Sequence, residues 1–127
     1  MNAPRATILV LAVTAMLVLA STAMPATAEN KICPKLSGHT WHAYGKSGKT
    51  YNWEVVGTAF TCGNAKHWVL KFVSEHVRGT SRVPLHGGPS GYHFVGTMID
   101  SKGYPYGGLC YQHTLAFPKN GFSWSPT

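Results

Sequence analysis

The chain has 127 residues and a formal net charge of +7, from 11 Lys and Arg against 4 Asp and Glu. This length is enough for one domain with a modest hydrophobic core and too short for a second. The basic residues form no run and include few Arg, which disfavours a dedicated nucleic-acid groove, while the sign of the charge favours anionic partners.

The first 28 residues have the pattern of a cleavable secretory signal peptide. Arg5 supplies a positive charge, residues 6–20 form an uncharged apolar run, and Ala26-Thr27-Ala28 provides the small residues that a signal peptidase reads. The run is shorter than the ~20 residues of a membrane-spanning helix, so we expect no transmembrane anchor in the mature form. The sequence predicts a secreted or cell-envelope protein with one small domain, residues 29–127, which keeps ten basic and four acidic residues and a charge of +6.

Two strands are expected at the start of the mature domain. Around Trp41 and again around Trp53, apolar residues alternate with more polar ones, the period of a half-buried strand. These patterns predict strands near residues 40–44 and 50–57, and the stretch 45–49 between them, rich in Gly, Ser and Lys, is typical of a turn.

A single amphipathic helix is predicted at about residues 62–78. Thr61 is a suitable N-cap, and Gly79 stands where a left-handed residue often ends a helix. The spacing of the apolar positions is helical; they are Ala65, Trp68, Val69, Phe72, Val73 and His76.

Strands follow a loop at residues 80–91. Aromatic and β-branched residues predict strands at 92–99, 106–115 and 121–124, with a hairpin turn at Asp100–Gly103. The order of elements is β-β-α-β-β-β. This order predicts an α+β fold in which the helix packs on a small antiparallel sheet.

Three cysteines, Cys33, Cys62 and Cys110, predict one disulfide and one unpaired thiol in an exported protein, with three pairings open. A bridge across tens of residues stabilises a domain of this size by roughly 3 to 4 kcal/mol in the chain-entropy model.

No metal site, cofactor or catalytic group is predicted. The seven histidines form no ligand motif: His39 and His42 point to opposite sides of a strand, and His67 and His76 to opposite sides of the helix. The three interior acids, Glu54, Glu75 and Asp100, are expected to be solvated charges. A site built from distant histidines such as His39, His86 and His113, and a reactive Cys62 at the helix N-terminus, stay open as alternatives.

Aromatic side chains are numerous for a domain of this size. We expect Trp53 and Trp68 in the core. A candidate binding surface, for sugar rings or a protein partner, is formed by Tyr104, Tyr106, Trp41 and Trp124.

Three short motifs resemble those of small exported proteins, largely uncharacterised, from actinobacteria and some other bacteria. They are Thr61–Ala65 at the helix start, Pro89–Tyr92 after the loop, and Phe122–Trp124 near the end. The pattern has one cysteine at the helix start, a second in a Gly-Trp-x-Cys-like stretch and a third in a late strand. No activity is attached to it.

The resemblance bears on the disulfide. Phe94 stands where the pattern has its second cysteine. If Phe94 replaced the partner of Cys62, the remaining pair would be Cys33 with Cys110; alternatively Cys62 pairs with Cys110 or with Cys33.

The sequence favours a non-enzymatic function. We expect an exported basic binding module, whose ligand is an unknown protein, such as an extracellular enzyme that it inhibits, or an anionic wall polymer. The alternative is a small secreted hydrolase or metal-binding protein that uses histidines and Cys62.

Overall fold

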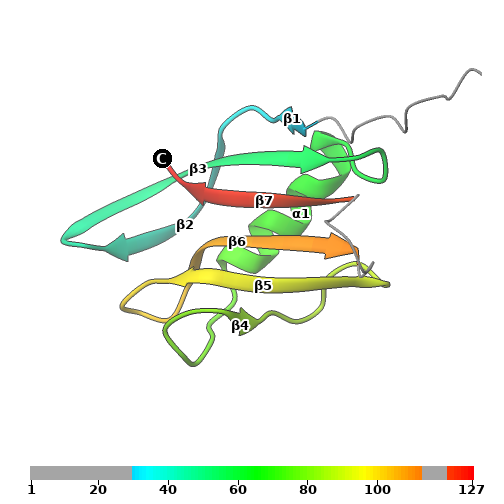
Figure 1. Ribbon diagram of the computed structural model, residues 1–127. Coiled ribbons are helices and arrows are strands. Elements are labelled where there is room, and N and C mark those ends of the chain that lie inside the picture. The colour runs from blue at the N-terminus through cyan, green and yellow to red at the C-terminus, as the bar shows by residue number, and fades with distance from the viewer. Residues whose placement is uncertain (1–29, 113–119) are drawn as a thin grey trace, which may run out of the picture.

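The computed structural model describes residues 30–112 and 120–127 and shows one sheet with one helix (Figure 1). The predicted signal peptide, residues 1–28, lies outside the described residues, as does His113. The α+β class is confirmed. The elements in chain order are β1 (Asn30–Ile32), β2 (Leu36–Ala43), β3 (Lys46–Val56), α1 (Cys62–Val73), β4 (Val83–Pro84), β5 (Tyr92–Ile99), β6 (Pro105–Gln112) and β7 (Gly121–Pro126).

The sheet is antiparallel throughout and is organised around β3, its longest strand. The strand order is β1-β3-β7-β6-β5-β4, and β2 also pairs with β3. The first half of β3 pairs with β2 and its last three residues pair with β1, both on the edge of β3 opposite β7. The β2–β3 hairpin therefore extends beyond the rest of the sheet at one end (Figure 1).

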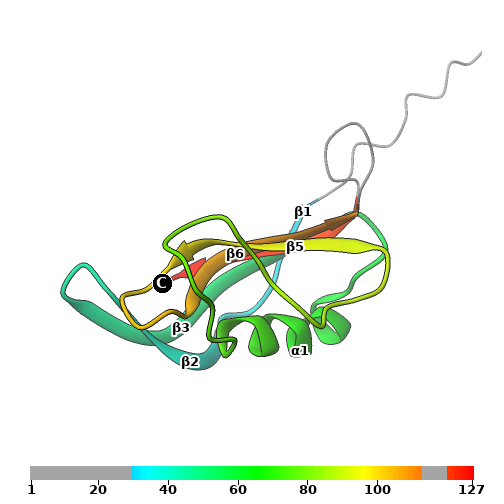
Figure 2. The ribbon, with the colours of Figure 1, turned by 90° about the horizontal axis from the view of Figure 1, so that it is seen from below.

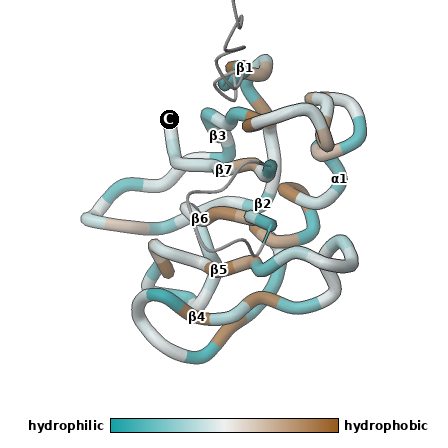
Figure 3. The backbone as a smooth tube through the Cα atoms, turned by 45° about the vertical axis from the view of Figure 1, so that its right-hand side comes forward, coloured by the Kyte–Doolittle hydropathy of each residue, from teal (hydrophilic) through white to brown (hydrophobic). Residues whose placement is uncertain are grey.

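The helix covers one face of the sheet (Figure 2). Thr61 begins it with a capping box, in which the Asn64 N–H donates to Thr61 Oγ1 and the Thr61 N–H to Asn64 Oδ1. Hydrophobic and hydrophilic residues alternate along α1 (Figure 3), and its buried side, which includes Val69 and Phe72, lies on the sheet. The Phe72 ring stacks on Phe94 and Trp124, with ring centroids 5.1 and 5.6 Å apart.

The core lies between α1 and the alternating inward positions of three central strands. It includes Tyr51, Trp53 and Val55 of β3, Tyr106 and Cys110 of β6, and Phe122 and Trp124 of β7. In the part of the chain that the structure describes, no helix is long and apolar enough to cross a bilayer.

The helix ends earlier than predicted, at Val73 rather than near residue 78. The Ser74 hydroxyl donates to the Leu70 carbonyl, which closes the last turn, and the Val77 N–H donates to the Gly103 carbonyl of the β5–β6 turn at 2.8 Å. This tertiary bond takes the donor that a longer helix would need, and His76 consequently lies beyond the helix on the surface.

The strands agree with the prediction in part. The strand at 92–99 and the turn at Asp100–Gly103 are found as predicted, whereas β1 and β4 were not expected and bring the sheet to seven strands. The predicted turn region 45–49 was wrong, because the hairpin turns at Tyr44–Gly45 and β3 begins at Lys46. The last residues of the predicted strand 106–115 lie outside the described residues.

A disulfide joins Cys33, between β1 and β2, to Cys62 at the start of α1. The two residues are 29 apart in sequence, and the bridge fastens the edge of the sheet to the helix N-terminus. The remaining cysteine, Cys110, is buried and unpaired. The pairing of Cys33 with Cys110 that the resemblance suggested was therefore wrong.

We expect the double variant Cys33→Ser/Cys62→Ser to lose roughly 3 to 4 kcal/mol of unfolding free energy, because its unfolded chain is no longer restricted by the closed loop. Urea denaturation with and without reductant measures this. Cys110→Ala is the matched control: reductant should destabilise it as it does the wild type, and should leave the double variant unchanged. A loss below about 1 kcal/mol would contradict the role of the bridge.

Candidate functional site: a groove on the β2–β3 hairpin

A buried carboxylate organises the end of the sheet where two hairpin turns meet. Asp100, in the β5–β6 turn, is only 6% exposed. Its Oδ2 accepts the backbone N–H of His42 at 2.9 Å, and its Oδ1 accepts those of Lys102 and Tyr104, each at 2.9 Å. Three N–H donors compensate for the lost hydration of the charge, so the expectation of a solvated Asp100 was wrong.

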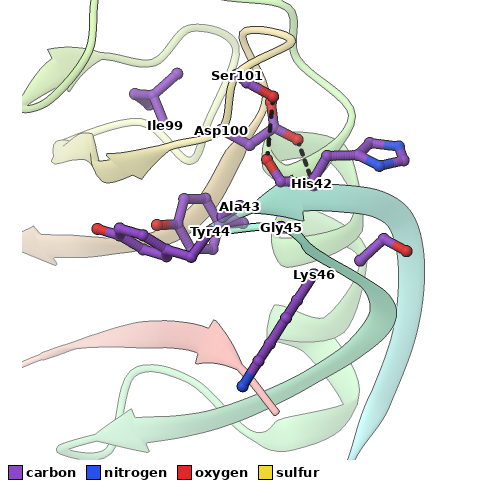
Figure 4. A pocket seen from close by; sticks show the side chains of 10 residues that line it. His42, Ala43, Tyr44, Gly45, Lys46, Ile99, Asp100 and Ser101 are labelled. Carbon is purple, nitrogen blue, oxygen red and sulfur yellow. Dashed lines mark hydrogen bonds between the residues drawn. The ribbon is translucent and has the colours of Figure 1, made fainter.

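Asp100 joins the β5–β6 turn to the outer edge of β2. Beside it, the backbone N–H and the hydroxyl of Ser101 both point to the His42 carbonyl oxygen, each at 3.3 Å. Both backbone groups of His42 on this edge are thus engaged (Figure 4), which prevents pairing with another strand there. The His42 imidazole is directed away from Tyr44 in the same view.

A surface hollow lies between the two turns that this contact holds together. Its volume is about 520 Å³, and Tyr44, Lys46, Asp100, Ser101 and Tyr106 are among the residues that line it (Figure 4). Burial, and then a hydrogen bond with the Tyr44 hydroxyl, raise the pKa of Tyr106 above its usual value. The raised pKa keeps the Tyr106 phenol neutral at ordinary pH.

A second hollow, of about 530 Å³, lies on the other side of Lys46 and Ser47, which line both. Its other lining residues are Trp41, Gly48, Thr50 and Thr127. The two hollows together are called the hairpin groove here. The Trp41 ring, in the lining of the second hollow, stacks on the Tyr106 ring, in the lining of the first, with centroids 5.9 Å apart, so the two hollows share one stacked aromatic pair.

Gly48 is required by the close approach of Trp41. A Cβ at this position would lie 2.7 and 2.9 Å from two carbons of the Trp41 indole, closer than atoms of a folded protein pack. The cross-strand pair of Trp41 and Gly48 thus leaves room for a large ring over the strand.

The hairpin turn itself carries an unusual residue. Ala43 pairs with Lys46, so only Tyr44 and Gly45 form the loop, with φ of 52° and 71°. This is the type I′ geometry, which favours Asn, Asp or Gly at both positions. A tyrosine there costs about 1 kcal/mol relative to glycine, yet the Tyr44 side chain is 93% exposed.

The four residues predicted to form a binding surface do not form one exposed platform. Trp41, Tyr106 and Trp124 are buried in the core, and Tyr104 is half-buried. Trp124 lies under α1 and donates its Nε1–H to the Pro105 carbonyl. Trp41 and Tyr106 nevertheless line the hairpin groove, Tyr106 in its first hollow and Trp41 in its second. Of the tryptophans expected in the core, Trp53 is buried and Trp68 is half-buried.

Tyr44, Lys46 and Asp100 were not among the predicted site residues. The Tyr-Gly pair between two alternating stretches was the available signal for Tyr44, since a two-residue loop with Gly in second place is a common hairpin turn. Asp100 is placed by contacts with residues far away in sequence, which no local pattern reveals.

The described histidines do not converge. Among residues 30–112 and 120–127, no three His, Cys, Asp or Glu side chains are placed to hold a metal ion. His39 stacks on Tyr104 with ring centroids 3.9 Å apart, and His86 contacts Glu75 through Nδ1 at 3.0 Å on the surface. His39 and His86 therefore serve separate local contacts.

The two cysteine positions that could carry thiol chemistry are both unsuited to it. Cys62 is in the disulfide, and Cys110 lies beneath the helix, where burial raises the pKa of its thiol to about 12. A thiolate is the nucleophilic form, so Cys110 is inert near neutral pH.

Comparison with protein-family models, with curated proteins and with solved structures found no match.

Asp100→Asn should lower the unfolding free energy by about 2 kcal/mol, because one amide NH₂ would then face a backbone N–H in place of an oxygen. Chemical denaturation measures the change. Ser101→Ala, which removes only the longer hydroxyl contact to His42, is the matched control and should cost less than about 1 kcal/mol. Equal effects of the two substitutions would contradict the central role of Asp100.

Cys110 should resist alkylation in the folded protein. At about pH 8, iodoacetamide should leave the native protein unmodified and add a single adduct after unfolding without reductant, since burial and the raised pKa both suppress the thiolate. Intact-mass spectrometry measures the adduct, and peptide mapping locates it. Rapid labelling of the native protein would show that the thiol is accessible.

Proposed function

We propose that this protein is an exported, non-enzymatic binding module for an anionic ligand, acting at the cell envelope or outside the cell. The observation that carries the proposal is that the described acidic side chains are engaged in hydrogen bonds and do not pair with Lys or Arg. The disulfide between Cys33 and Cys62 is consistent with an oxidising compartment.

Each described acid is engaged within the protein. Asp100 accepts three backbone N–H groups, Glu75 accepts from the backbone and ring of His86, and Glu54 accepts the Ser123 hydroxyl at 3.4 Å. Between the described residues, no Lys or Arg forms an ion pair with an acid. The exposed lysines and arginines therefore present positive charge that no neighbouring acid neutralises, which attracts anions.

Most of these cations are spread over the surface, and only some lie beside a hollow. Lys46 lines both halves of the hairpin groove, and the exposed Tyr44 lines one of them. A cation between two hollows that share a stacked aromatic pair is an arrangement that binds a ligand without needing a nucleophile or a general base. The alternative, a hydrolase or metal-binding protein, gains no specific support from the described histidines or from Cys110.

Binding to a soluble polyanion should depend strongly on salt. We expect affinity for poly-glutamate and dextran sulfate at ~0.05 M NaCl and a loss of at least about tenfold at ~0.5 M, because the Debye length shrinks to a few ångströms. Isothermal titration calorimetry measures both. A neutral dextran is the control ligand and should not bind. The proposal is overturned if neither polyanion binds at low salt.

A further inference from the structure

We propose that the hairpin groove binds a saccharide that carries acidic groups, with the Tyr44 ring against a sugar ring and the Lys46 ammonium on the acid. This inference rests on the proposed function and names its site and its class of ligand. Four features of the groove carry it: Tyr44, Lys46, the hydroxyls of its walls, and the indole N–H of Trp41.

Tyr44 is a residue that folding alone does not explain. Its backbone is in the left-handed region, at φ 52°, and its side chain is 93% exposed, so it contributes little to the core and disfavours its own turn. Its hydroxyl interacts with that of Tyr106, which contributes to the raised pKa of Tyr106. The exposed Tyr44 ring lines the groove, where its aromatic face is available for stacking.

Lys46 supplies the charge at the junction of the two hollows. It is the residue directly after the turn, and with Ser47 it lines both sides. Asp100 is the acid nearest to this place among the lining residues, and its oxygens are occupied by backbone N–H donors. The Lys46 ammonium is therefore available to a carboxylate, sulfate or phosphate of a ligand.

Trp41 adds a donor that nothing in the described chain uses. The residue is 8% exposed, and its Nε1–H has no hydrogen-bond partner among the described residues. The nitrogen lies against Gly48: a Cβ built there would be 3.1 Å away, and Gly48 lines the second hollow with Trp41. A buried N–H without an acceptor is unfavourable, so a ligand oxygen that entered the second hollow at the edge of the indole would gain a hydrogen bond.

These features together select the ligand class. Aromatic faces bind the C–H surface of a sugar ring, and the hydroxyls of Ser47, Thr50 and Ser101 suit the hydroxyl groups around such a ring. The ammonium adds a requirement for negative charge. Each hollow, at about 520 and 530 Å³, has room for at least one ring, so a chain of acidic sugars would span the groove.

Tyr44→Asn tests the site without harming the fold. Asn is favoured at this position of a type I′ turn, so the melting temperature should be unchanged or higher, while affinity for polygalacturonate, the acidic-sugar probe, should fall about tenfold with the loss of the ring. Titration calorimetry and thermal unfolding measure the two quantities. Binding of polygalacturonate that is unchanged in Tyr44→Asn overturns the inference.

Lys46→Gln and Lys49→Gln form a matched pair, because both lysines are exposed on β3 and only Lys46 lines the groove. We expect about tenfold weaker binding of polygalacturonate for Lys46→Gln and less than about twofold for Lys49→Gln. Equal losses would show that only total charge matters, and would overturn the site.

The choice of polymer separates the two proposals. Binding of polygalacturonate about tenfold tighter than poly-glutamate, at equal charge concentration, supports the acidic-sugar site. Equal binding of both polymers overturns this inference and leaves the proposed function intact. If no polyanion binds, the proposed function fails as well.

Discussion

The buried carboxylate of Asp100 is the constraint on which the end of the sheet depends. Burying a charge is unfavourable unless hydrogen bonds replace its hydration, and here one backbone N–H comes from β2 and two from the β5–β6 turn. Three bonds from two separate hairpins fix the distance between them. The hollow between Tyr44 and Tyr106 owes its shape to this distance, since its walls belong to those two hairpins.

The opposite end of the sheet is held by different means. There the disulfide joins Cys33 to the first residue of α1. The stacked rings of Phe72, Phe94 and Trp124 hold the helix against the sheet. Covalent and apolar contacts therefore fix the helix, while polar contacts fix the groove.

Features that depend on neighbouring residues could be predicted from the sequence, whereas features that depend on distant contacts could not. The capped start of the helix at Thr61 and the strand at 92–99 have periodic patterns of their own, and both were predicted correctly. The helix end was missed because the Val77 N–H bonds to Gly103, a residue 26 positions away. Asp100 was predicted to be a solvated charge and Trp41 to belong to a binding surface, yet both residues are buried. Burial by segments that are distant in sequence leaves no periodic signal.

Two non-glycine residues of the described chain have a left-handed backbone, Tyr44 at φ 52° and Arg82 at φ 50°, and of the two only Tyr44 lines the groove. At other positions the local rules and the fold agree: Thr61 caps a helix, and Gly48 accommodates the ring of Trp41. A chain in which most local choices support the fold is expected to depart from them where function requires it. Tyr44 lines the same hollow as Lys46 and Asp100, and the Asp100 oxygens already accept backbone N–H groups. Tyr106, which also lines this hollow, stacks on Trp41. A groove that is held in place before a ligand arrives would lose little conformational entropy on binding, which favours the proposed binding function.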